Sequence, residues 1–88
     1  MTSLGLYRSR ADGAQTVEAV NGWLAFAVRD REGMRNRYRR KNVLPTFAEE
    51  RAFLDVLDLL LDRRLVVAAR EERERRALAA RRREEARP

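Results

Sequence analysis

The sequence contains neither cysteine nor histidine among its 88 residues. Disulfides are therefore excluded, and so are zinc sites built from the usual cysteine and histidine ligands. The commonest general base and the commonest thiol nucleophile are also missing. We therefore expect a non-enzymatic protein with no cofactor, no metal and no small-molecule substrate.

Long apolar runs are lacking as well. No stretch approaches the roughly 20 uncharged apolar residues of a membrane span, and the leucines at 59–61, for example, lie between Asp58 and Asp62. The N-terminus has no basic segment followed by an apolar one, as a signal peptide would have. We expect a protein of the cytoplasm that has no membrane partner.

Lysine is almost absent from a chain that is rich in charge. Charged residues make up 39% of the sequence and the net charge is +6, yet Lys41 is the single lysine beside 19 arginines. Arginine binds phosphate and carboxylate groups through two parallel hydrogen bonds. This composition permits nucleic acid or acidic protein partners without choosing between them.

The clearest structural signal is a helix beginning at about residue 46. Thr46 and Glu49 have the spacing of a capping box, and Pro45 stops any helix arriving from the other side. The apolar side chains of residues 46–69 cover about half of the helix circumference, which is wider than a lone surface helix needs. They are Phe47, Phe53, Leu54, Val56, Leu57, Leu60, Leu61, Leu65, Val67 and Ala68.

An earlier stretch, from about residue 14 to 41, also has apolar side chains at helical spacing. Asp12 or Thr16 is suited to cap its start. Asn21-Gly22 is, however, a type I′ turn signal, so a β-hairpin is the alternative for residues 16–28. Alanines nearby favour the helix, while Gly22 and Gly33 predict fraying or a kink.

These signals predict an all-α fold, an antiparallel hairpin of two helices at about 14–41 and 46–85. Residues 1–13 are expected to form an irregular leader, anchored by Leu4, Leu6 and Tyr7, before a hairpin domain at 14–69. Residues 70–88 hold eight arginines and five glutamates. They should continue the second helix into solvent as a charged tail, supported by pairs four residues apart.

If the chain folds back at residues 42–45, a residue of the first helix lies beside the residue of the second helix for which the two numbers add up to about 88. Arg31 is then expected to pair with Asp58, and Arg35 with Asp55 or Glu50. Val17 should lie near Glu71, with nothing beside the tail beyond that point.

Two helices offer no enclosed interior for the wide apolar face of the second one. We therefore expect self-association, most simply a dimer that closes a four-helix bundle, or a protein partner. The predicted interface residues are Trp23, Phe26, Phe53, Val56, Leu57, Leu60 and Val67.

A basic run at the end of the first helix is the candidate site for a polyanion. Arginines with an interspersed tyrosine suit a phosphate backbone, although basic residues here also complement the helix dipole. A nucleic-acid-binding regulator is therefore the alternative function. The candidate residues are Arg35, Arg37, Arg39, Arg40 and Lys41. By contrast, Asp55, Asp58 and Asp62 are expected to form a solvated or arginine-paired face.

Residues 16–62 contain a helix, a break and a second helix, in that order. A helix that is apolar and then arginine-rich (17–31) precedes the break Val43-Leu44-Pro45, and a second helix carries Phe53-Leu54-Asp55-Val56-Leu57. In this order the chain resembles the small arginine-rich helical proteins encoded by phages of actinobacteria. The resemblance implies an accessory or regulatory role in the host cytoplasm and no chemistry.

Overall fold

A computed structural model describes residues 3–87, and the side chains from residue 5 onward. These residues form three helices, α1 (Ser3–Gly13), α2 (Val17–Arg40) and α3 (Phe47–Glu85). The all-α prediction is therefore confirmed for the described part of the chain. The molecule is long and thin, 72 × 19 × 17 Å, and its radius of gyration of 18.8 Å exceeds the about 12 Å of a compact chain of this length.

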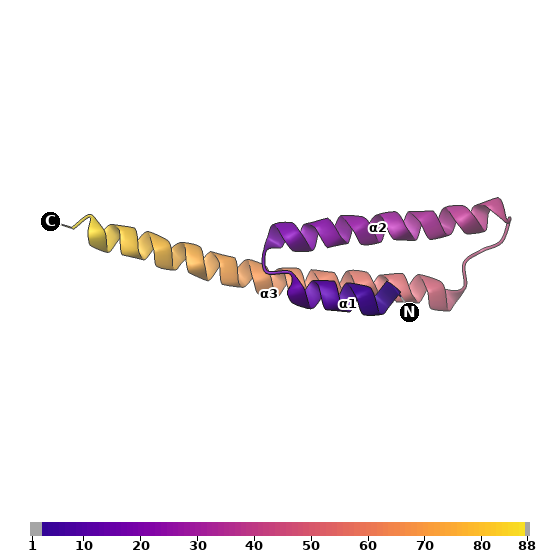
Figure 1. Ribbon diagram of the computed structural model, residues 1–88, viewed down its shortest axis with the longest axis horizontal. Helices are drawn as coiled ribbons and strands as arrows, with labels where there is room; N and C mark the ends of the chain where they lie inside the picture. Colours follow the sequence, from indigo (N-terminus) through magenta and orange to yellow (C-terminus); the bar gives the residue numbers. More distant parts are fainter. Residues whose placement is uncertain (1–2, 88) are drawn as a thin grey trace.

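Figure 1 shows the arrangement of the three helices. α2 runs beside the first part of α3 in the opposite direction, and α1 lies against both and runs in the same direction as α3. The second part of α3 extends alone to the C-terminus. One end of the molecule is thus a three-helix bundle, and the other is a single helix.

The prediction of an irregular leader is wrong, because residues 3–13 form the helix α1. Its inner face carries Tyr7 and Ala11, and Ala14 follows directly after the helix; all three are buried. Two glycines in this short helix disfavour it locally. Burial against α2 and α3 offsets that cost, which the local sequence does not reveal. The expected anchor Leu4 has its side chain outside the described part.

α2 begins at Thr16, whose hydroxyl oxygen accepts a 3.0 Å hydrogen bond from the Ala19 amide. The helix continues through Asn21-Gly22, so the helical prediction is confirmed and the β-hairpin alternative is wrong. Neither Gly22 nor Gly33 ends the helix, and the fraying or kink expected at these glycines stays a prediction.

The connection from α2 to α3 turns at Asn42, which has a positive φ of 57°. The Val43 amide donates to the Tyr38 carbonyl at 3.1 Å and the Asn42 amide to Arg39 at 3.0 Å. This is the Schellman pattern that ends helices at a left-handed residue. Thr46 then caps α3, accepting a 3.2 Å hydrogen bond from the Glu49 amide as predicted.

The predicted register between α2 and α3 is correct at its two ends. The Val17 amide donates to Glu71 Oε1 at 3.0 Å, so a side chain of α3 caps the first turn of α2. Arg35 pairs with Glu50 at 3.0 Å, one of its two predicted partners. The pair Arg31–Asp58 is wrong, because Arg31 also binds Glu50. Beyond Glu72 the described residues of α3 are exposed.

Candidate functional site

Three of the residues predicted to face a second subunit are buried inside this chain. Val56, Leu60 and Val67 are 2%, 0% and 0% exposed, and they belong to the same core as the inner face of α1. Their assignment to a subunit interface is therefore wrong. The physical reason is that α1 covers this face of α3, which a two-helix hairpin leaves open.

Trp23 and Phe26 also contact α1. The Tyr7 ring lies 6.4 Å from the Trp23 ring and 6.3 Å from the Phe26 ring, measured between centroids. The guanidinium of Arg10 lies 5.4 Å above the Trp23 ring, a cation–π contact. Trp23 is half-buried, while Phe26 remains 48% exposed. The two aromatic residues therefore help to hold α1 in place.

Polar contacts fix α1 more firmly than the sequence suggests. The Tyr7 hydroxyl donates a 2.5 Å hydrogen bond to Asp30 Oδ2. Burial, together with this hydrogen bond to a carboxylate, raises the pKa of Tyr7 well above its usual range. At the other end, the Arg63 side chain donates to the carbonyl oxygens of Asp12 and Ala14. The one sequence signal for this docking is the spacing of Tyr7, Ala11 and Ala14.

The remaining two predicted interface residues, Phe53 and Leu57, are half-buried. Leu57 packs against the core cluster. Both therefore keep only part of their surface for any further partner.

A different set of apolar side chains on α3 is exposed. Phe47 is 83% exposed, Leu54 45%, Leu61 50% and Leu65 69%. At about 100° per residue these four lie within about 40° of one another around the helix, on the side opposite the buried face. We call Phe47, Leu54, Leu61 and Leu65 the α3 stripe, which extends over about 27 Å. The sequence marks these residues as apolar but does not show that they stay uncovered.

Arg51 and Asp58 lie within the α3 stripe. Both are exposed. Helical spacing places Asp58 within about 60° of the four apolar side chains and Arg51 within about 80°. Arg51 forms a 3.2 Å ion pair with Asp55, four residues on. The acidic line at 55, 58 and 62 is therefore partly paired with arginine, and the described residues contain no cluster suited to a metal ion.

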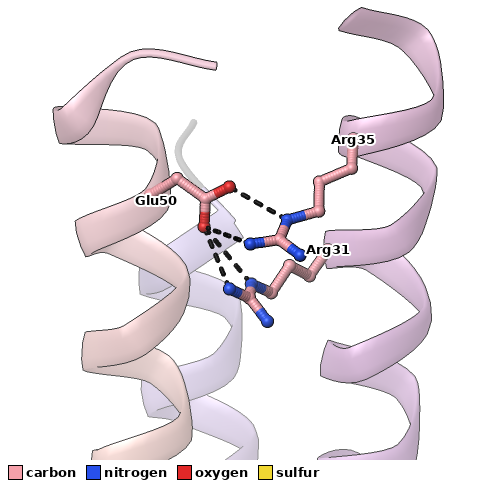
Figure 2. A network of polar contacts seen from close by, with 3 residues as sticks. All are labelled: Arg31, Arg35 and Glu50. Atoms are coloured by element: carbon pink, nitrogen blue, oxygen red, sulfur yellow. Dashed lines mark hydrogen bonds and ion pairs between the residues drawn. The ribbon is translucent and has the colours of Figure 1, made fainter. Parts of the chain in front are cut away.

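The basic end of α2 is only partly available to a polyanion. Figure 2 shows Glu50 of α3 facing Arg31 and Arg35 of α2, with its carboxylate accepting from both guanidinium groups. The hydrogen bond from Arg35, supported by Arg31, lowers the pKa of Glu50. Of the candidate polyanion residues, Arg35 is thus already engaged by a carboxylate.

The other four candidates surround the end of the helix. Arg39 donates to the side chain of Asn36 at 3.4 Å. Arg37, Arg40 and Lys41 are exposed, and within residues 3–87 none of them forms an ion pair with a carboxylate. Positive side chains therefore remain at this end of the bundle, on more than one side of the helix.

A second tyrosine–carboxylate contact stabilises the same end. The Tyr38 hydroxyl donates to the Glu49 carboxylate, which also accepts a 2.9 Å hydrogen bond from the Thr46 hydroxyl. The hydrogen bond between them raises the pKa of Tyr38 and lowers the pKa of Glu49. These contacts join the end of α2 to the first turn of α3, so Tyr38 and Glu49 have a structural role.

The geometry thus defines an elongated helical protein with an apolar stripe on α3 and a basic surface at the end of α2. Comparison with known proteins finds no matching family model, no matching curated protein and no matching solved structure. Among the described helices, none combines the length and the apolar character that crossing a membrane requires.

Proposed function

We propose that this chain is a non-enzymatic helical interaction module that binds a protein partner, or a second copy of itself, through the α3 stripe. The observation that carries the proposal is the position of the stripe. Four large apolar side chains form one line on the uncovered side of a helix whose other side is packed. Contiguous exposed apolar surface of this kind is typical of protein interfaces, and helices bind grooves or other helices through such lines.

Two neighbouring residues provide a matched test. Leu65 belongs to the α3 stripe and is 69% exposed, whereas Val66 is 59% exposed and points about 100° away. We expect Leu65→Asp to weaken association at least about tenfold, because a desolvated charge opposes burial, and Val66→Asp to change it less than about twofold. The measurements are native mass by light scattering at about 1–100 µM and affinity for any protein copurified with the chain. Equal binding by wild type and Leu65→Asp would contradict the proposal.

The alternative function is nucleic-acid binding, and it is favoured by the basic surface formed by Arg37, Arg39, Arg40 and Lys41. Replacing all four with alanine should weaken binding to a short duplex and reduce its dependence on salt, because phosphate contacts release counterions. Fluorescence anisotropy at two salt concentrations measures both effects. A variant with alanine at 81–83 in the tail separates the contribution of the tail arginines. Binding that is independent of salt would exclude this function.

The resemblance to accessory proteins of actinobacterial phages stays a prediction. Within the present proposal it suggests that the module regulates or assists a protein of the host cytoplasm. Docking through one helix face needs no catalytic group, in agreement with a sequence that has neither histidine nor cysteine.

A further inference from the structure

Together with Arg51 and Asp58, the four residues of the α3 stripe form a row of six exposed positions, 47, 51, 54, 58, 61 and 65. The spacing of this row is symmetric about residue 56, since the numbers of its outer, middle and inner pairs each add up to 112. The stripe begins with the first residue of α3. It ends after Leu65, since the next positions on the same side of the helix are Ala69 and Glu72. A second α3 running in the opposite direction therefore presents an identical stripe of equal length.

The charges within the stripe distinguish two orientations of such a pair. In an antiparallel pair centred at residue 56, Phe47 faces Leu65 of the second copy. Arg51 faces Leu61 of the second copy and lies one helical turn, about 5 Å, from its Asp58. This opposite-charge contact occurs twice by symmetry. In a parallel pair in register, Arg51 faces Arg51 and Asp58 faces Asp58, and like charges oppose association.

From the spacing of these exposed positions and from the opposite charges of Arg51 and Asp58, we infer that the α3 stripe is a two-fold, antiparallel interface between two copies of the chain. The inference rests on the proposed function and names the partner. The two α3 helices lie at the centre of the dimer, and each carries its own α1 and α2 on the outer side. The free C-terminal parts of α3 project in opposite directions. In this register Leu54 faces Asp58 of the second copy. The two contacts between Arg51 of one copy and Asp58 of the other supply the self-complementary charges of a two-fold interface.

Disulfide trapping tests the orientation, because the natural chain has no cysteine. Phe47→Cys and Leu65→Cys are prepared as separate full-length proteins, mixed and oxidised. In the antiparallel dimer the two different cysteines lie opposite one another, whereas two copies of either cysteine are about 27 Å apart, far beyond the about 4–7 Å between the Cα atoms of a disulfide. We expect crosslinked dimers from the mixture and none from either protein alone. Crosslinking of either protein alone would overturn the inference.

Charge exchange tests the contact between Arg51 and Asp58 of the second copy. Arg51→Asp and Asp58→Arg should each raise the dimer dissociation constant at least about tenfold, because each places like charges across the interface. The double variant restores opposite charges and should return the constant to within about threefold of wild type. Arg51→Asp also removes the ion pair with Asp55, so the thermal midpoint of each monomer serves as the control. A double variant as weak as the single variants would refute the pairing.

The outcomes separate this inference from the proposed function. The wild-type chain could stay monomeric at about 100 µM and bind another protein, while Leu65→Asp fails to bind that protein. This result would overturn the inference and leave the proposed function standing. A dimer that forms crosslinks between identical positions would do the same. A dimer that is insensitive to Leu65→Asp would contradict both.

Discussion

The two sides of α3 carry the same kinds of side chain and have opposite environments. Leu60 is fully buried, and its neighbour Leu61 is 50% exposed. The difference lies in what covers each side, since α1 and α2 pack on the first while nothing in the described chain packs on the second. Apolar periodicity therefore shows that a helix side can be buried, but the arrangement of the other helices decides which side is.

The largest expected effect is a difference in stability between substitutions of Leu60 and Leu61. Leu60→Ala should lower the free energy of unfolding by about 2–5 kcal/mol, because it removes buried methyl groups and leaves a cavity. Leu61→Ala should cost less than about 1 kcal/mol in the monomer, since half of its side chain already contacts water. Urea unfolding followed by circular dichroism, at a concentration low enough to keep the chain monomeric, measures both. Similar losses for the two variants would refute the distinction between the sides of α3.

The next effect concerns the helix that covers the buried side. Tyr7→Phe keeps the buried ring but removes the hydroxyl that donates to Asp30. We expect a loss of about 1.5–3 kcal/mol, the usual contribution of a hydrogen bond to a charged group. Tyr38→Phe is the matched control, because its hydroxyl also donates to a carboxylate, but near the exposed end of α2. The control should lose less stability in the same unfolding measurement, and a larger loss for the control would contradict the role assigned to Tyr7.

The smallest effect concerns the ion pairs at the edge of the α2–α3 contact. The two arginines hold the pKa of Glu50 below its ordinary value of 4.5. A carboxylate with a lowered folded-state pKa contributes stability above its unfolded pKa, and that contribution disappears as the pH falls through the folded value. The thermal midpoint of wild type should therefore fall more steeply than that of Glu50→Gln between about pH 5 and pH 3. Parallel pH profiles would show that the pair contributes nothing to folding.

Much of the local structure was predictable from the sequence. Thr46 and Glu49 identified the start of α3, and the alanines near Asn21-Gly22 correctly outweighed the turn signal. The register was correct at Val17, whose backbone amide donates to the Glu71 side chain. It was wrong for Arg31, because a long, flexible side chain can reach either of two carboxylates and the choice depends on the packed positions of both helices.

The candidate surfaces were less predictable. Arg35 belonged to the predicted basic site, but its pairing with Glu50 depends on the contact between helices. Val56 and Leu60 were expected at a subunit interface because α1 was not recognised as a helix. The buried residues of this segment are a single tyrosine and two alanines, a weak pattern on its own. Helix formation there depends on burial against residues about 20 to 60 positions away in the chain.

The sequence by itself determined the helical class, the beginning of α3, the break at 42–45 and the solvent-exposed tail. These features depend on capping, backbone preference and charge within a few residues. Only the tertiary structure decided that α1 is a helix, that it covers Val56, Leu60 and Val67, and that the α3 stripe remains exposed. Burial depends on which distant surfaces meet, and apolar spacing along one helix does not record that.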